Sequence, residues 1–317
     1  MRIGYFLSCE QFGPRELVDK ARRAEEAGFQ DLWISDHYHP WNDEQGQSPF
    51  VWTVIGQLAE ATSRMRVTTA VTCPTIRIHP AVIAQAAATA TVALDGRFNL
   101  GVGTGENLNE HILGDHWPEA EERIEMLEEA IEVMRMLWQG GTRSHRGRHY
   151  RVENARIYTL PPEPPPVVVS GFGRRSVELA GRVGDGYAIT MPDRDLISHF
   201  HSAGGQGKPV QAGAKVCWDE DEQRAIDEVH RLWPNEVLPG ELAQVLPTPA
   251  HFEQATELVT KEMVAESVPC GPDLDKHLQA LQQYADAGAD ELYVQQIGPD
   301  LEGFFSTYSR EVLPKFT

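Results

Sequence analysis

Cysteine is scarce in this sequence. Four cysteines are spread over 317 residues, at Cys9, Cys73, Cys217 and Cys270, and no two of them form a C-x-x-C pair. Disulfide-stabilised secreted domains and zinc modules need denser and more regularly spaced thiols. The pattern indicates a protein of the reducing cytoplasm, with no sign of a metal-binding cluster.

Basic residues and long apolar runs are also in short supply. The 28 Lys and Arg residues are outnumbered by 47 Asp and Glu residues, and the formal net charge of −19 opposes binding to nucleic acid or anionic lipid. The most apolar segment, Ala81 to Leu94, is too short to cross a bilayer, and the N-terminal MRIGYFLSCEQFG lacks the long apolar core of a signal peptide. We expect no nucleic-acid partner and no membrane span, and a small molecule as the ligand.

Strand and helix patterns alternate through the first half of the chain. A buried strand over Arg2 to Ser8 precedes a helix that opens at Pro14 and stops at Gly28. The order then repeats, with strands over 31–36, 66–74 and 97–105 and helices over 49–63, 79–94 and 122–139. The first half therefore predicts four βα units.

The second half continues this alternation after one interruption. Residues 142–161 predict a hairpin built from RGRHYRV and ARIYTL. The elements expected after it are a strand over 166–172, a helix from Arg175, strands over 187–190 and 213–218, a helix over 219–233, a loop over 234–249, a helix over 274–288, a strand over 291–298 and a closing helix through Phe304 and Phe305.

About eight βα units predict an α/β fold, a (βα)8 TIM barrel with insertion segments that forms a single domain over residues 1–317. An open, doubly wound sheet is the alternative. That fold normally carries a G-x-G-x-x-G turn after its first strand, and the corresponding SCEQFGP does not match it. The barrel is therefore favoured.

The active site of such a barrel lies at the carboxyl ends of its strands, so the residues that follow each strand are the candidates. They should converge on one mouth. These residues are Ser8, Asp36, His37, Val71 to Thr75, Glu106, Asn109, Ser170 to Arg175 and Thr190.

The stretch ISDHYHPW, residues 34–41, follows the second strand with an acid, two histidines, a tyrosine and a tryptophan. Each has a structural interpretation: Asp36 as a helix N-cap, His37 as a hydrogen-bonded structural residue and Trp41 as a packing residue. Their position at the expected mouth favours a functional interpretation. His39 has no assigned role.

Glu106 follows GVGTG at the end of the fourth strand, where glycines let the backbone approach a ligand closely. A loop cap is its structural alternative. Together with His37 it would form a pair that exchanges protons near neutral pH, with the face of Trp41 available to a flat ring or a cation. The pattern predicts a redox or acid–base site without a metal.

The stretch VVVSGFGRRS predicts an anion site at a helix start. Backbone N–H groups, the helix dipole and the guanidinium groups of Arg174 and Arg175 would together hold a phosphate. A solvated basic pair is the alternative. In an acidic protein, at the end of a barrel strand, phosphate binding is favoured.

In combination, SDHYHPW, TTAVTCPT, GVGTGENLNE and AGRVGDGYAIT resemble the luciferase-like oxidoreductase superfamily, in particular the branch of F420-dependent glucose-6-phosphate dehydrogenase, over nearly the whole chain. The resemblance implies coenzyme F420, a deazaflavin, and a homodimer. It implies that His37, Trp41 and Glu106 surround the reacting centre, with His37 near the substrate hydroxyl and Glu106 near N1 of the ring. Which of His37 and Glu106 is acid and which is base stays open.

The resemblance also implies a non-prolyl cis peptide at Ala70–Val71, under the deazaflavin ring. Cys73 stands where the family has a coenzyme-contacting threonine. Thr190 would face the substrate. The implied coenzyme contacts are Asp36, Ala70, Val71, Cys73, Thr104, Gly105 and Asn109, with Phe172, Gly173, Arg174, Arg175 and Ser176 at the phosphate.

The sequence departs from the family at the substrate. Three basic residues that hold a sugar phosphate in the family align with Asp193, Ala243 and Ala265, although Arg194 or Lys261 could compensate. Because a phosphate would lose its ionic partners, we expect an uncharged alcohol or carbonyl compound. An FMN-dependent monooxygenase of the same superfamily and a non-catalytic flavin- or deazaflavin-binding protein are the alternatives.

Overall fold

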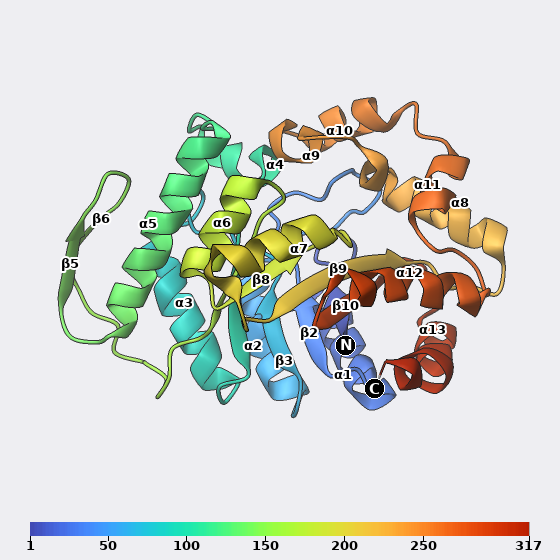
Figure 1. Cartoon of the computed structure of the whole chain (residues 1–317), viewed down its shortest axis with the longest axis horizontal. Helices are drawn as coiled ribbons and strands as arrows, with labels where there is room; N and C mark the ends of the chain where they lie inside the picture. The colour runs from blue at the N-terminus through green and yellow to red at the C-terminus, as the bar shows by residue number, and fades with distance from the viewer. Residues whose placement is uncertain (317) are drawn as a thin grey trace.

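The computed structural model describes residues 1–316 and contains eight parallel strands closed into a barrel, in the order β1-β10-β9-β8-β7-β4-β3-β2 (Figure 1). The predicted TIM barrel is confirmed, and the open sheet is excluded because β1 pairs with both β2 and β10. The barrel strands are β1 (Arg2–Leu7), β2 (Asp31–Ile34), β3 (Arg66–Thr69), β4 (Phe98–Val102), β7 (Val167–Ser170), β8 (Gly186–Ile189), β9 (Val210–Val216) and β10 (Glu291–Gln296).

Helices connect the strands and surround the barrel (Figure 1). Apolar residues at helical spacing, such as Leu17, Ala21 and Ala24, are fully buried, which is why these segments are amphipathic helices. The connecting helices are α1 (Pro14–Ala27), α2 (Val51–Ala61), α3 (Pro80–Ala93), α5 (Ala120–Trp138), α6 (Arg174–Val183), α7 (Arg194–Phe200), α8 (Glu222–Leu232), α12 (Leu274–Ala287) and α13 (Leu301–Thr307).

Aromatic side chains fill the centre of the barrel. Trp33 stacks on Tyr293 with 4.6 Å between ring centroids, and Phe6 packs edge-on against Trp33 at 5.6 Å. Val168 and Ala188 complete this interior cluster. The barrel is thus a packed core, and the open space lies at the mouth above it.

The strand β3 ends at Thr69, earlier than the predicted 66–74. The backbone then passes through a cis peptide between Ala70 and Val71, at the predicted position, and Thr72 pairs again with Val102 of β4. The neighbouring strand accommodates this path only with glycine, because a Cβ on Gly101 would lie 1.8 Å from the carbonyl oxygen of Thr69. The segment bulges toward the mouth of the barrel as a result.

The predicted hairpin is present, but with different strands. β5 (Arg143–Arg146) pairs antiparallel with β6 (Arg151–Ala155), beside α5 in Figure 1. The turn falls at Gly147, whose N–H donates to the carbonyl of Tyr150, so RGRHYRV contains the turn instead of a whole strand. ARIYTL begins at Ala155, the last residue of β6, and its other five residues lie beyond the strand.

The sequence predicts a loop over 234–249, but this segment contains helical turns. It contains a short 3-10 turn, Pro234–Val237, and α9 (Leu242–Val245), and is followed by α10 (Pro249–Thr256) and α11 (Lys261–Ser267). Prolines that were interpreted as breakers stand at the first helical position, where no N–H is needed. α9 contacts the short helix α4 (Asn107–Glu110), since Asn107 donates to the carbonyl of Val245.

The starts of one strand and one helix differ from the predicted ones. β9 begins at Val210, three residues before the predicted strand, and ends at Val216. α8 begins at Glu222 because the side chain of Asp221 caps it, accepting from the N–H groups of Gln223 and Arg224. Across residues 1–316, every helix is too short or too polar to span a bilayer.

Candidate active site

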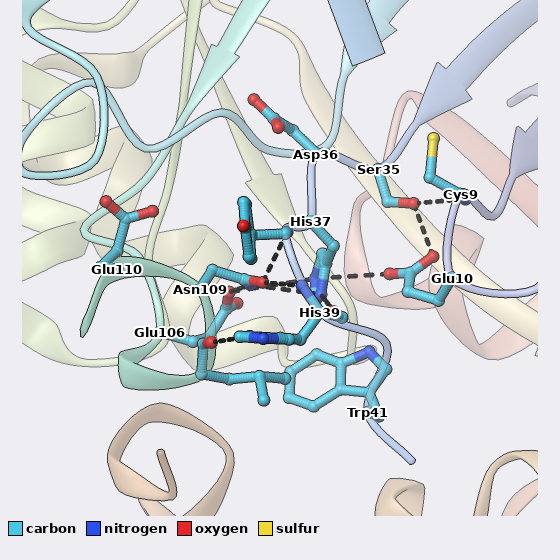
Figure 2. A network of polar contacts seen from close by, with 12 residues as sticks. Cys9, Glu10, Ser35, Asp36, His37, His39, Trp41, Glu106, Asn109 and Glu110 are labelled. Atoms are coloured by element: carbon cyan, nitrogen blue, oxygen red, sulfur yellow. Dashed lines mark hydrogen bonds and ion pairs between the residues drawn. The ribbon is translucent and has the colours of Figure 1, made fainter. Parts of the chain in front are cut away.

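Three strand ends bring a histidine and two carboxylates together at the mouth. Glu10 follows β1, His37 follows β2 and Glu106 follows β4. Nε2 of His37 lies 3.3 Å from a carboxylate oxygen of Glu10 and 3.9 Å from one of Glu106 (Figure 2). The predicted pair of His37 and Glu106 is therefore assembled, with Glu10 as a second carboxylate on the same ring nitrogen.

The other ring nitrogen of His37 has both an acceptor and a donor within reach. Nδ1 lies 3.1 Å from the carbonyl oxygen of His39 and 3.2 Å from the side-chain nitrogen of Asn109. When Nε2 carries a proton toward the carboxylates and the ring is neutral, Nδ1 accepts a hydrogen bond from the amide of Asn109. When the ring is charged, Nδ1 also carries a proton and donates to the carbonyl oxygen of His39. Both protonation states of His37 are accommodated, as an acid–base residue requires.

The side chain of Asn109 connects the turn after β2 to Glu106. Its side-chain oxygen accepts from the N–H groups of Tyr38 and His39, at 2.8 and 3.1 Å, and its nitrogen also donates to Glu106. The residue is buried. The amide of Asn109 fixes the turn that carries His37, and its predicted contact with the coenzyme stays a prediction.

Glu10 is the residue that sequence reasoning missed. Its other oxygen accepts from the hydroxyls of Ser8 and Ser35, both at 2.7 Å (Figure 2). Burial acts to raise the pKa of Glu10, but the charge of His37 and the hydrogen bonds from Ser35, its own backbone and Ser8 outweigh burial, so the pKa is lowered. Glu10 is thus a carboxylate held against His37. The available signal was its place just after β1, equivalent to that of His37 after β2.

Trp41 lies beside the histidine. The centroids of the Trp41 and His37 rings are 4.9 Å apart, and the other side of Trp41 meets Phe252 of α10 at 5.1 Å. Its backbone N–H donates to Gln45, which in turn donates to the carbonyl of Leu232. The aromatic ring is therefore held in place at the reacting end of the site.

Asp36 has a structural role that differs from the N-cap interpretation, because α2 begins only at Val51. Its carboxylate accepts from the hydroxyl of Thr72 and forms an ion pair with Arg77 at 3.0 Å. Arg77 also pairs with Glu110, so two buried acids share one guanidinium. Burial raises the pKa of Glu110 to about 7, against the opposing charge of Arg77. Figure 2 shows Asp36 and Glu110 pointing away from the ring of His37.

The predicted phosphate residues lie together at the start of α6. Gly173 is the N-cap residue, and the hydroxyl of Ser176 accepts from its N–H at 3.2 Å. The first N–H groups of a helix have no acceptor within the helix. Arg174 and Arg175 are exposed, with Arg174 near His199 and Arg175 paired with Glu121, and Phe172 is also exposed. This end has the donors and charge for a phosphate.

The remaining predicted coenzyme residues follow β3 and β4, with Ala70, Val71 and Cys73 after β3 and Thr104 and Gly105 after β4. Gly105 has φ of 79°, and a Cβ there would lie 2.6 Å from the sulfur of Cys73, so only glycine fits. Cys73 contacts the hydroxyl of Thr75, and burial raises the pKa of its thiol well above the ordinary value. Thr104 is half-buried, as are Ala70 and Val71. The close packing of Cys73 against Gly105 joins the segment after β3 to the segment after β4, next to Glu106.

Thr190 stands apart from the proton-exchanging residues. It follows β8, is exposed, and its carbonyl accepts from the hydroxyl of Tyr284. Within residues 1–316, no three His, Cys, Asp or Glu side chains gather closely enough to hold a metal. All four cysteines are buried free thiols.

The chain matches the family described as luciferase-like monooxygenase over residues 1–291, and it belongs to this luciferase-like family. The two relatives compared here are both named F420-dependent glucose-6-phosphate dehydrogenase. The one from Amycolatopsis mediterranei is 35% identical over 99% of this chain and 98% of its own length, and the one from Microbacterium testaceum is 36% identical over 99% and 97%. The predicted family is confirmed.

A solved structure gives the same result in three dimensions. An F420-dependent secondary alcohol dehydrogenase, in complex with an F420-acetone adduct, is similar to this chain with a TM-score of 0.92 and 27% identity, over 100% of this chain and 99% of that one. A coenzyme F420 dependent tetrahydromethanopterin reductase from Methanopyrus kandleri, at 20% identity and a TM-score of 0.80, shares the fold.

Proposed function

We propose that this protein transfers a hydride between the carbinol carbon of an uncharged alcohol, or the corresponding carbonyl compound, and C5 of the deazaflavin F420. It is an oxidoreductase of the luciferase-like family that uses this coenzyme. The observation that carries the reaction type is the His37 ring, held at one nitrogen by two carboxylates and at the other by an acceptor and a donor. That arrangement moves a proton without a metal.

The residues present fit the coenzyme at both of its ends. The start of α6, with Arg174, Arg175 and Ser176, supplies N–H donors and cationic charge for its phosphate. Ala70 and Val71 after β3 and Thr104 after β4 are half-buried, so small side chains and backbone are available there to a flat ring. When bound, F420 supplies the hydride-accepting carbon, and the protein supplies position and proton transfer.

The side chains divide the proton chemistry between them. His37 exchanges the proton of the substrate hydroxyl, and Glu10 stabilises the charged ring from 3.3 Å. Glu106 is less buried than Glu10, with 30% of its side chain exposed, and faces the mouth. Trp41 covers the reacting end.

An uncharged substrate is supported by the positions where the family's phosphate-binding residues align. Asp193 caps α7 by accepting from the N–H of Leu196, and no cation replaces it there. The two candidates for compensation are occupied: Arg194 donates to the carbonyl of Asp286, and Lys261 pairs with Asp227 at 2.7 Å. A phosphate that entered the site would lose its bound water and gain no ionic partner in return.

The FMN-dependent monooxygenase remains the second candidate, since the family is named for that activity. The identities of 35% and 36% to F420-dependent relatives favour F420. The non-catalytic alternative is disfavoured because the proton-exchanging residues are assembled. The family resemblance further supports a single-domain chain, residues 1–317, acting as a cytoplasmic homodimer.

The first test is a titration with F420 and with FMN, followed by Trp fluorescence, and then a screen of alcohols for reduction of the bound coenzyme. We expect F420 to bind preferentially and to be reduced by an uncharged alcohol. Preferential binding of FMN would move the assignment to the monooxygenase.

Variants of the two predicted catalytic residues test the proton chemistry. His37→Ala and Glu106→Gln should each lower kcat by about 10²–10⁴-fold while F420 still binds, because general acid–base catalysis contributes about that much. The exposed His116→Ala is the matched control and should keep full turnover. Unchanged turnover in both variants would show that these two residues do not carry the proton chemistry, whereas F420 binding without any turnover in the wild type would favour the non-catalytic alternative.

A further inference from the structure

A cavity opens on the far side of the mouth from Glu106. It has a volume of about 310 Å³ and is bounded by β8, β9 and the helices α11 and α12. Its lining includes Phe6, Thr190, Gly213, Lys215, Glu236 and Tyr284. Phe6 belongs to β1, the strand that leads to Glu10, so the cavity lies against the same strand as one of the proton-exchanging residues.

Gln295 lies in the wall of the barrel next to this cavity. It pairs with Lys215 in the register of β10 and β9. Strand residues alternate between two faces, and Tyr293 of the same strand points into the barrel interior, so Gln295 points inward as well, one layer closer to the mouth. The side chain is 1% exposed.

The amide of Gln295 is unusual among the interior glutamines. Within residues 1–316, neither its nitrogen nor its oxygen has a hydrogen-bond partner. By contrast, Gln211 accepts from Trp33 and donates to Glu291, and Gln296 bonds to the backbone of Trp218 at both amide atoms. A buried amide without partners is costly, and such groups in native proteins generally have a function.

Lys215, the neighbour of Gln295, carries no free charge into the cavity. Its Nζ forms an ion pair with Glu236 at 2.7 Å and lies 4.5 Å from the centre of the Trp233 ring. The pair is formally neutral. This wall therefore offers hydrogen bonds without net charge, which disfavours a phosphate or carboxylate and suits hydroxyl groups.

We propose that Gln295 and the Lys215–Glu236 pair form a second polar subsite, and that the substrate is a neutral polyhydroxylated alcohol, such as a diol, a polyol or an unphosphorylated sugar. One hydroxyl faces His37 and a second bonds to the amide of Gln295. A hydroxyl both donates and accepts, and so does an amide, so each satisfies the other. This inference rests on the proposed function and extends it from an uncharged alcohol to a specific class.

The test compares a substrate with one hydroxyl, 2-propanol, with 1,2-propanediol and D-glucose. For Gln295→Leu we expect kcat/KM with the diol or the sugar to fall about tenfold or more, because a hydrogen bond between substrate and amide is lost. Turnover of 2-propanol and the affinity for F420 should stay unchanged. The Tm should hold or rise, because an apolar side chain replaces an unpaired amide.

Gln296→Leu is the matched control in the same strand. Its amide is fully bonded, so the substitution should lower the Tm and leave the ratio of kcat/KM for diol and 2-propanol unchanged. Opposite behaviour of the two leucine variants separates a substrate contact from a packing residue. The inference is overturned if Gln295→Leu lowers the Tm and reduces turnover of all substrates equally, or if the wild type shows no preference for the second hydroxyl.

Failure of the proposed function has a different signature. If the wild type binds F420 and reduces it with none of the three compounds, the uncharged-alcohol assignment itself is wrong, and the subsite is overturned with it. If 2-propanol is a substrate and the diol and sugar are not, the proposed function stands and only the subsite is wrong.

Discussion

The two sides of the barrel mouth are built differently. On the side of β1, β2 and β4, the carboxylates of Glu10 and Glu106, the ring of His37 and the amide of Asn109 are bonded to one another and to the backbone. On the side of β9 and β10, the amide of Gln295 has no partner in the part of the chain described, and Lys215 is neutralised by a neighbouring acid. The first side holds its geometry by itself, and the second is arranged to receive a ligand.

This difference separates reaction from selection. A fully bonded network keeps its shape whatever compound is bound, so it suits the step common to all substrates. An unpaired amide gains most when a matching group arrives, so it discriminates among substrates. Variants of the first side should change kcat for every substrate, and variants of the second should change preference.

Apart from the variants of His37 and Glu106 themselves, the largest effect is expected for Glu10→Gln, which keeps the shape of the side chain and removes its charge. Without the carboxylate beside Nε2 of His37, kcat should fall about 10–100-fold for all alcohols, with F420 affinity retained. Glu26→Gln, an exposed residue of α1, is the control. Steady-state kinetics with a diol and with 2-propanol measure the effect. A substrate-dependent loss would break the contrast between the two sides.

Glu10→Gln should also change stability in acid. The pKa of Glu10 is lowered in the folded protein, so its carboxylate stabilises the fold above the unfolded pKa, and this contribution is lost as the pH falls through the folded pKa. Unfolding curves of the variant should therefore be less sensitive to acid than those of the wild type. An identical acid dependence in both proteins would contradict the assigned shift.

A smaller effect is expected on the other side, for Glu236→Gln. This change exposes the charge of Lys215, so kcat/KM for an anionic substrate such as a sugar phosphate should rise about tenfold relative to the neutral sugar. A second substitution, Lys215→Met, should cancel the gain, and the exposed Glu257→Gln should show none. Equal changes for charged and neutral substrates would show that this wall does not select by charge.

The smallest effect concerns Glu110, buried behind the bonded side. Its folded pKa is raised to about 7, so the stability contributed by the protonated form is complete below the unfolded pKa of about 4.5 and is lost as the pH rises through 7. Glu110→Gln mimics the protonated form. Its Tm relative to the wild type should rise by about 2–4 °C between pH 5 and pH 8.

Thermal unfolding at several pH values measures this difference, with the exposed Glu122→Gln as the control. A difference in Tm that is the same at every pH would show that Arg77 keeps Glu110 charged.

Much of the site was predictable because its residues are close neighbours in the sequence. His37 and Trp41 come from one turn, and Gly105 and Glu106 from another, so a short sequence window contains each group and its position after a strand. The contacts between windows were only partly predictable. Glu10 was missed because its role depends on reaching His37 from another strand. The ion pair between Asp36 and Arg77 was not predicted either, because Arg77 follows a different strand.

The least predictable region was 234–267. Few of its apolar residues are buried and its prolines resemble loop punctuation, but Phe252 and Val264 find a buried surface only when the rest of the fold is present. Pro249 then begins a helix. Local propensity was overridden there by tertiary packing.

The sequence by itself determined the alternation of strands and helices, the closed barrel and the residues that stand at each strand end, because these follow from periodicity over neighbouring residues. Only the tertiary structure decided which of those residues meet, such as Glu10 with His37 and Asn109 with the turn that carries His37. It also left the amide of Gln295 without a partner among residues 1–316. The reason is physical. Hydrogen bonds and desolvation depend on distances between strands far apart in the chain, and those distances exist only when the barrel has closed.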